Sequence, residues 1–150
     1  MITAQDVAKL RQITGAGMMD AKKALEESNG DFDKAKEVLQ AKYAEKAEKK
    51  ADRETGEGFI GTYVHNGKSA SLVALACETD FVARNEEFRE LAQNIALHIT
   101  ALISEDAEIQ DILNSNYIKD PSMTIAQLLK TKIGILGENI QIVGFKKISL

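Results

Sequence analysis

The sequence has no tryptophan, one proline, one cysteine and two histidines. A single cysteine cannot form an internal disulfide, which is typical of a protein from a reducing compartment. Cys77 closes an apolar run, so a small buried hydrophobe is favoured over a reactive thiol. His65 and His98 are isolated from each other and from any ligand cluster, so they provide neither a nucleophile with its base nor a metal site.

Strong charge and phosphate-binding loops are also missing. The net charge is −4, and the only aromatic residues are five phenylalanines and three tyrosines, which disfavours nucleic-acid binding. No Walker loop, GxGxxG or GxSxG occurs, so neither a cofactor nor a small-molecule substrate is expected. No apolar run approaches the roughly 18 residues of a membrane span, and the first residues do not resemble a signal peptide. We therefore expect a cytoplasmic protein, not bound to membrane, that acts by binding and is not an enzyme.

Residues 1–44 predict a bundle of three short helices. Thr3 and Asp6 form a capping pair, the glycines at 15 and 17 break the first helix, and Asn29-Gly30 ends the second. Apolar residues at helical spacing are expected to face inward: Val7, Leu10, Ile13, Met18, Ala21, Leu25, Phe32, Ala35, Val38, Leu39 and Tyr43. Met19 is left open between the interior and the surface.

Residues 45–55 predict a charged helical linker. The segment from Lys42 to Glu54 is rich in Lys, Glu and Ala, which are good helix formers, and Glu45 and Lys49 are a favourable i,i+4 pair. Its lysines are nearly balanced by acids, so a solvated surface is favoured over a basic docking site.

Residues 56–150 predict a second domain of the α+β class, a small antiparallel sheet packed with helices. Phe59–Val64 and Ser69–Cys77 flank Asn66-Gly67, the strongest short hairpin signal. An amphipathic helix follows, with His98 at the margin of an inward face made of Phe88, Leu91, Ala92, Ile95, Ile99 and Leu102. The remaining expected elements are a short acidic helix over Ser104–Leu113, an extended connection over Tyr117–Pro121, a helix from Thr124 ended by Gly134 and Gly137, and a final strand over Asn139–Leu150.

The stretch CETDFVARN, from Cys77 to Asn85, is the strongest candidate for a functional site. It follows a buried strand directly, and Thr79 or Asp80 can cap a helical turn. Phe81 then stands at the first turn, before any helical period is established. It can fold onto the next helix as a hydrophobic staple, which the pattern alone favours, or project as a wedge for a partner protein.

Four short motifs, in the same order, resemble the signatures of the bacterial translation elongation factor Ts family. They are Thr14–Asp20 followed by Lys22–Leu25, then Asn29–Asp31, Thr79–Ala83 and Gly137–Ile140. The resemblance extends from Ile2 to about Leu150. Members of this family are guanine-nucleotide exchange factors for elongation factor Tu. The resemblance therefore implies that the chain promotes GDP release from that partner by destabilising its magnesium and phosphate site.

The resemblance also implies roles for particular residues. The first three helices look like the family's ubiquitin-associated-like module, and the positions that touch the partner's nucleotide-binding domain correspond to Arg11, Met18 and Met19. The motif that inserts beside the partner's magnesium and phosphate site corresponds to Thr79, Asp80, Phe81 and Val82. On this resemblance the wedge is favoured over the staple.

The chain departs from longer members of the family in its middle. A short acidic segment leads directly to Tyr117–Pro121, and neither a basic, aromatic segment nor a coiled coil has a counterpart. A reduced core with an exposed sheet edge and an apolar final strand can pair with a copy of itself, and short members of the family are dimers. We therefore predict a homodimer. The alternative function is a non-catalytic helical adaptor that binds another protein through the N-terminal bundle.

Overall fold

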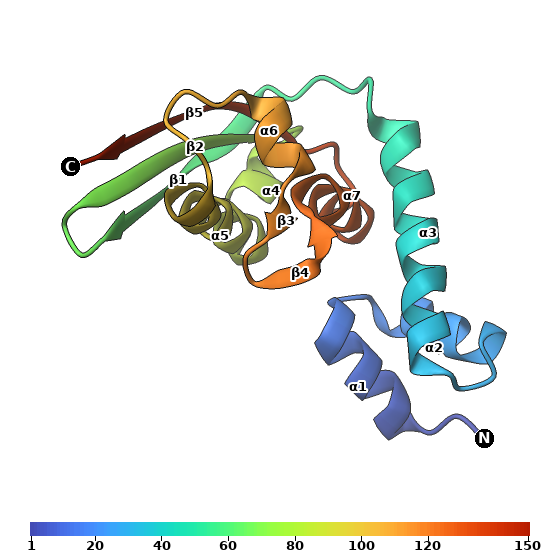
Figure 1. The fold of residues 1–150 in the computed structure, drawn as a ribbon. Coiled ribbons are helices and arrows are strands. Elements are labelled where there is room, and N and C mark those ends of the chain that lie inside the picture. The colour runs from blue at the N-terminus through green and yellow to red at the C-terminus, as the bar shows by residue number, and fades with distance from the viewer. The chain divides into compact units, whose positions relative to one another are not determined.

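The computed structural model describes all residues, 1–150, and combines helices with antiparallel strands (Figure 1). The elements are α1 (Ala4–Thr14), α2 (Met18–Glu27), α3 (Phe32–Lys50), β1 (Glu57–His65), β2 (Ser69–Cys77), α4 (Asp80–Ala83), α5 (Glu86–Leu102), α6 (Ile109–Asn114), β3 (Asn116–Tyr117), β4 (Asp120–Thr124), α7 (Ile125–Leu136) and β5 (Gln141–Ser149). This mixture confirms the α+β class. None of the helices combines the length and apolar content that a membrane crossing requires.

The chain divides into two compact units. Unit 1 comprises residues 1–49 and 130–137, and unit 2 comprises residues 50–129 and 138–150. The first boundary falls inside the segment expected to be a linker, and α3 is one continuous helix from Phe32 to Lys50. The division into 1–44, 45–55 and 56–150 stays a prediction.

Unit 1 is built on small residues where its helices meet. Thr3 and Asp6 cap α1 reciprocally, as predicted, and Gly15 ends α1 in the left-handed conformation with φ 75°. The buried cluster consists of Leu10, Ala16, Ala21, Ala24, Leu25, Ala35, Leu39 and Tyr43. Alanines let helix backbones approach closely, so this small core can close around few large side chains.

Two residues expected inside unit 1 lie on its surface. Ile13 and Met18 are both exposed, so the prediction of an inward position is wrong for each. The physical reason is the short connection between α1 and α2, in which Ala16 is buried and occupies the interior. The helical spacing predicted that the apolar face of α1 extends to Ile13, but Ile13 is the second-last residue of α1 and lies beyond the buried part. The same spacing predicted that the apolar face of α2 begins at Met18, whereas the first buried residue of α2 is Ala21.

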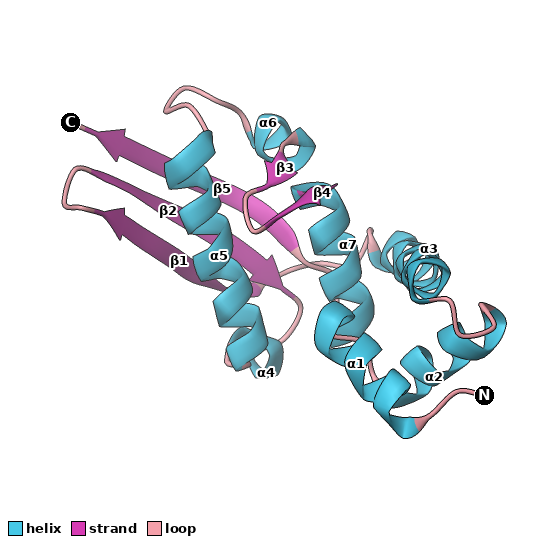
Figure 2. Ribbon diagram, turned by 60° about the horizontal axis from the view of Figure 1, so that its bottom comes forward, coloured by secondary structure: helices cyan, strands magenta, loops and turns pink.

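Unit 2 is organised around an antiparallel sheet of order β1-β2-β5 (Figure 2). The predicted hairpin is confirmed: Asn66 and Gly67 have φ of 52° and 68°, and Lys68 N donates to His65 O at 3.0 Å. Two central residues with positive φ are the requirement of a type I′ turn, whose twist matches that of the strands. β2 is therefore the central strand, paired with β1 on one side and with β5 on the other.

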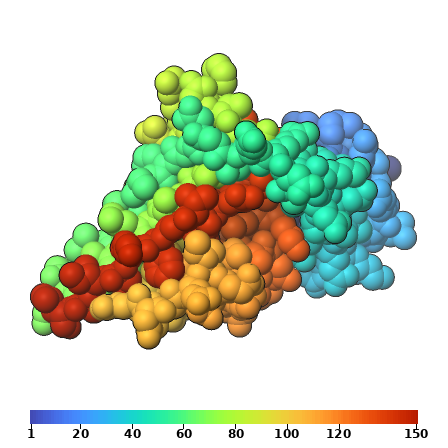
Figure 3. All heavy atoms as spheres, turned by 90° about the horizontal axis from the view of Figure 1, so that it is seen from above, coloured from blue at the N-terminus to red at the C-terminus, as the bar shows by residue number.

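Helix α5 packs along one face of this sheet, and the other face carries no helix. Gly61 and Val73 are register partners on the face toward α5, and the helix buries Phe88, Leu91, Ala92, Ile95, Ala96, His98 and Ile99. Leu102, expected inside, is exposed because it is the last residue of α5 and the backbone turns extended at Ile103. The opposite face is seen from above in Figure 3, with β5 in red beside the green strands. The strand register places five exposed apolar residues on this face: Ile60, Val64, Leu72, Val143 and Ile148.

The C-terminal third differs from the expectation in three places. The acidic helix begins at Ile109 and not at Ser104, because Asp106 accepts a hydrogen bond from Ser104 and Glu108 caps α6. The extended connection over 117–121 contributes to a small ladder of β3 and β4. Gly134 does not end α7 but lies inside it, where a Cβ would be 2.4 Å from Cδ1 of Tyr43.

Candidate functional site

The stretch from Cys77 to Asn85 forms a tight turn between β2 and α5. Thr79 caps α4, since its Oγ1 accepts from Val82 N at 3.4 Å, and Asn85 caps α5 by accepting from Glu87 N at 2.8 Å. Side-chain caps satisfy N–H groups that have no partner within their helix. Two short-range caps in seven residues therefore make the chain leave the sheet, form one helical turn and start a new helix.

Phe81 projects from this turn into solvent. Its side chain is 81% exposed, whereas Ala83, two residues later, is buried. Asp80 is partly exposed and lies 3.5 Å from the Arg84 guanidinium, an ion pair across one helical turn. The staple interpretation, which the pattern alone favoured, is wrong, because Phe81 is not packed onto the following helix. The single turn of α4 buries its small residue and presents its aromatic one.

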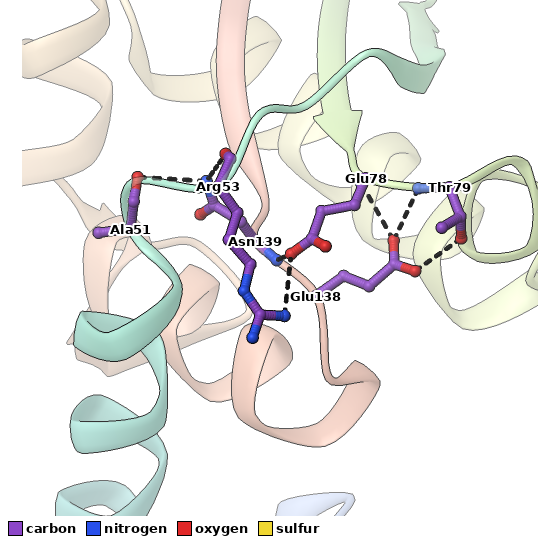
Figure 4. A network of polar contacts seen from close by, with 6 residues as sticks. All are labelled: Ala51, Arg53, Glu78, Thr79, Glu138 and Asn139. Atoms are coloured by element: carbon purple, nitrogen blue, oxygen red, sulfur yellow. Dashed lines mark hydrogen bonds and ion pairs between the residues drawn. The ribbon is translucent and has the colours of Figure 1, made fainter.

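The carboxylate of Glu138 holds the start of the turn (Figure 4). Its Oε1 accepts from Glu78 N at 3.1 Å and from Thr79 N at 3.0 Å, and its Oε2 accepts from Thr79 Oγ1 at 2.6 Å. Hydrogen bonds to an ionised acceptor are about twice as strong as neutral ones. One side chain thus occupies both backbone donors at the point where the chain leaves β2.

The side chain of Glu78 in turn contacts the segment that contains Glu138. Glu78 Oε1 accepts from Asn139 N at 2.8 Å and lies 3.6 Å from the Arg53 guanidinium. The Asn139 side chain is buried, and its Nδ2 donates to the carbonyl oxygens of Ala51 at 3.3 Å and Arg53 at 2.9 Å. Figure 4 shows that the network joins three segments: the chain after α3, the end of β2 and the connection before β5.

Arg89 of α5 holds the other end of the turn. Its Nε donates to Ala83 O at 3.1 Å, and its guanidinium lies 4.7 Å from the ring centroid of Phe59 in β1. The cation–π contact and the hydrogen bond fix the same side chain. Because α4 is anchored at its capping residue, Thr79, and at its last residue, Ala83, Asp80 and Phe81 form a projecting tip on a supported base.

Cys77 is not a reactive group. Burial, and secondarily the negative charge of Glu138, raises the pKa of the Cys77 thiol to about 11. The thiol therefore stays protonated at neutral pH, and its Sγ donates to Thr79 O at 3.3 Å. This confirms Cys77 as a small buried hydrophobe that also supports the turn.

The two histidines lie in different surroundings, one buried and one exposed. His98 is fully buried, with Nε2 2.7 Å from Ser115 Oγ and Nδ1 accepting from Ile118 N at 3.1 Å. Burial lowers the pKa of His98, so the ring is neutral at pH 7. His65 is exposed beside the hairpin turn, 3.0 Å from the hydroxyl of Tyr63. Nowhere do three or more His, Cys, Asp or Glu side chains gather as metal ligands would.

The residues expected to bind a partner in unit 1 also lie on the surface. Met18 and Met19 are each 60% exposed at the start of α2, and the Nε of exposed Arg11 donates to Ala16 O at 3.3 Å. Met18 and Arg11 line an open, mostly apolar groove of about 360 Å³, together with Ile2, Thr3, Ala4, Val7, Ala8, Lys22 and Glu26. Met19 lies next to Met18 in sequence but does not line the groove.

Comparison with known proteins identifies the family. The model of the family Elongation factor TS matches residues 78–150. The chain is 41% identical to elongation factor Ts of Nitratidesulfovibrio vulgaris, with 99% of this chain and 96% of that protein covered, and 40% identical to the chloroplastic elongation factor Ts of Rhodomonas salina, with 99% and 89% covered. The chain belongs to the elongation factor Ts family.

Relatives in the family differ in length. Elongation factor Ts of Aquifex aeolicus is 48% identical over 145 residues, and the chain covers only half the length of that protein. The alignment with the Nitratidesulfovibrio relative runs over 193 positions, more than the 150 residues here, so it contains gaps in this chain. Some relatives are thus about twice as long as the aligned region, and others align with this chain over nearly their whole length.

Three residues that support the turn had no role assigned from the sequence: Glu138, Asn139 and Arg89. The first two belong to the Gly137–Ile140 stretch that resembles the family's signature, so a signal for their importance was present. The sequence contained no signal for their contact with Glu78 and Thr79, since the contacting residues are about 60 positions apart. Arg89 reads in the sequence as an ordinary surface residue of an amphipathic helix.

Proposed function

We propose that this chain is a guanine-nucleotide exchange factor for elongation factor Tu that promotes GDP release during translation elongation. The observation that carries the proposal is Phe81, a large apolar side chain 81% exposed on a turn that is anchored at both ends. Burying such a side chain in a partner contributes about 2 kcal/mol. An exposed aromatic on a supported base is a binding element, and the family membership supports this partner.

The mechanism needs no covalent chemistry, so the chain is not an enzyme in that sense. Bound GDP is held by Mg²⁺ and by loop amides around its phosphates. A ring inserted beside this site displaces the groups that order it, and the adjacent Asp80 carboxylate repels the phosphates. Thermodynamic linkage requires that nucleotide weaken the exchange factor by the same factor. Nucleotide rebinding therefore releases the chain from its partner.

The residues Thr79, Asp80, Phe81 and Val82 are proposed as the group that acts at the magnesium and phosphate site. Arg11, Met18 and Met19 are proposed as a second contact on the same partner. Exposed methionines adapt to the shape of a partner surface, and the groove lined by Met18 and Arg11 offers a place for a side chain of the partner. Two contact regions would account for specificity that a single ring cannot supply.

We further propose that the chain is a homodimer that works in the cytoplasm. The helix-free face of the sheet exposes Ile60, Val64, Leu72, Val143 and Ile148, and three of its residues, Ile60, Ala74 and Val143, line a hollow. An apolar face of this extent is suited to covering by an identical face. Nucleic acid, membrane and small-molecule substrates are not among the proposed partners.

The test is the release of fluorescent GDP from elongation factor Tu, followed by stopped flow. Wild-type chain should accelerate release strongly, and Phe81→Ala should lose most of that acceleration while keeping the wild-type circular dichroism spectrum. Leu102→Ala, which also truncates an exposed apolar side chain of unit 2, is the matched control and should behave as wild type. A folded wild-type chain that binds without accelerating release would leave the adaptor as the function.

A further inference from the structure

We propose that Glu138 is a positioning residue for Phe81, which acts by fixing the backbone from which the ring projects. The inference rests on the exchange function proposed above and adds to it a residue outside the Thr79–Val82 contact group. The geometry that points to it is a single carboxylate that accepts three hydrogen bonds from two consecutive residues, Glu78 and Thr79.

The first step concerns the donors that Glu138 satisfies. The β1–β2 ladder ends at Cys77, so the N–H groups of Glu78 and Thr79 lie beyond the strand pairing. Both donate to the same oxygen, Glu138 Oε1. Without that acceptor, the two groups would point into a partly buried space and the chain would be free to turn differently. Glu138 therefore defines the direction in which the chain leaves the sheet.

The second step connects this direction to the ring. Thr79 is the cap of α4, and Phe81 is the second residue of that helix. A helical turn inherits its orientation from its capping residue, because the cap sets where the first free N–H groups point. Glu138 Oε2 also accepts a hydrogen bond from the Thr79 hydroxyl, which leaves the lone pairs of Thr79 Oγ1 to accept from Val82 N.

The third step is that α4 is too short to be stable without contacts from the rest of the protein. It has four residues and buries only Ala83, whereas an isolated helix needs about 12–15 residues to be marginally stable in water. Its conformation depends on contacts made by Glu138 and Arg89 at its two ends. If the first contact is lost, Phe81 samples several directions, and ordering the ring beside the nucleotide site then raises the free energy of the step that releases GDP.

Glu138 is itself held in place before any partner binds. Gly137 has φ 81° and its N–H donates to Ile133 O at 2.9 Å at the end of α7. On the other side, Asn139 is fixed by its hydrogen bonds to Ala51 O, Arg53 O and the Glu78 carboxylate. The carboxylate therefore projects from a segment whose neighbours are fixed on both sides, as Figure 4 shows for Asn139.

The test uses substitutions of Glu138 that separate the length of its side chain from its charge. Glu138→Gln keeps the length, loses the charge, and can still accept both backbone N–H bonds while donating to Thr79 Oγ1. Glu138→Asp keeps the charge and is one methylene too short to reach both residues. We expect Glu138→Asp and Glu138→Ala to lower the maximal rate of GDP release five- to tenfold, and Glu138→Gln to stay within about threefold of wild type. Glu105→Ala, which removes an exposed carboxylate, is the control.

Two further measurements separate positioning from a general structural role. Hydrogen exchange by NMR should show loss of protection at the amides of Glu78 and Thr79 in Glu138→Asp but not in Glu138→Gln. In the Phe81→Ala background, adding Glu138→Asp should leave the residual release rate unchanged, since the ring through which it acts is gone. If Glu138→Ala does not fold, the comparison of Gln with Asp decides alone.

Three results would overturn the inference while leaving the exchange function intact. They are wild-type release by a folded Glu138→Asp, better release by Asp than by Gln, and an equal further loss when Glu138→Asp is added to Phe81→Ala. Absence of any acceleration by the wild-type chain would instead remove the exchange function and this inference with it.

Discussion

A side chain at Gly61 of β1 would collide with the backbone of Ala92 in α5, since its Cβ would lie 2.3 Å from the Ala92 carbonyl oxygen. The helix and the strand thus approach as closely as two backbones can. This contact sets the distance at which α5 lies on the sheet, and with it the position of Arg89, which holds the end of the Phe81 turn.

Gly61→Ala should therefore destabilise the fold. The added methyl group meets backbone atoms that cannot rotate away, and overpacking of this kind costs about 1–3 kcal/mol. Urea unfolding monitored by circular dichroism measures the change. Gly56→Ala is the matched control, because its Cβ would meet nothing within 4 Å and should leave the midpoint nearly unchanged. Equal midpoints for the two variants would contradict the close approach.

The buried His98 predicts a loss of stability in mild acid. Ile118 N donates to Nδ1, so the ring carries its proton on Nε2 and donates it to Ser115 Oγ. Protonating Nδ1 would break this arrangement, and burial lowers the folded-state pKa below the ordinary 6.5. The unfolded chain therefore takes up the proton first. The contribution of His98 to stability is complete above pH 6.5 and decreases as the pH falls below it, by at most about 1.4 kcal/mol per pH unit.

Unfolding free energies at pH 7.5 and 5.5 measure this effect. The difference between the two pH values should shrink in His98→Gln and stay at the wild-type size in His65→Gln, which alters an exposed ring. All three proteins contain the same carboxylates, so the contribution of these groups cancels in the comparison. The same pH dependence in His98→Gln as in wild type would show that the buried ring is not its source.

The homodimer proposal predicts that Leu72→Lys weakens self-association. Leu72 is an exposed residue of the central strand on the helix-free face, and a lysine there would place a charge in the middle of the proposed interface. Sedimentation velocity should show a dimer for wild type and a dimer dissociation constant at least 100-fold higher for the variant. Ile13→Lys, an equivalent change on the surface of unit 1, should remain dimeric. A wild-type chain that is monomeric at high concentration would disprove the proposal.

Met18→Ala should change affinity for elongation factor Tu and not the maximal release rate. The side chain is an exposed lining residue of the groove in unit 1, remote in sequence from the Phe81 turn. Truncating an interface anchor typically costs 1–2 kcal/mol, which is about a tenfold increase in the concentration needed for half-maximal release. Lys23→Ala on the same helix is the control. A reduced plateau with unchanged half-maximal concentration would assign Met18 to the release step itself.

Features decided by neighbouring residues could be predicted from the sequence. The Asn66-Gly67 hairpin, the Thr3 and Asp6 capping pair and the cap at Thr79 each depend on atoms within a few positions. Residue type and spacing contain that information directly. The order of helices and strands follows from such signals, which is why the α+β class could be predicted.

Features decided by distant residues could not be predicted. Gly134 was expected to end a helix, yet α7 continues through it to Leu136, and the ring of Tyr43 leaves room only for a glycine there. The β3–β4 ladder was missed because a two-residue strand shows no alternation of apolar and polar residues. Phe81 is exposed on a turn whose start is hydrogen-bonded to Glu138, about 60 positions away along the chain, whereas the local pattern favoured a packed ring.

The dependence of the Phe81 turn on Glu138 has a consequence for synthesis of the chain. A growing chain contains β1, β2 and the whole CETDFVARN stretch well before it contains Glu138 or β5. Contacts between residues far apart in sequence form late, because the intervening loop must first be closed. Until then the ring of Phe81 has no defined direction. Until Glu138 is in place, a nascent chain should therefore lack the GDP-release activity of the finished protein, whatever contact its N-terminal helices make.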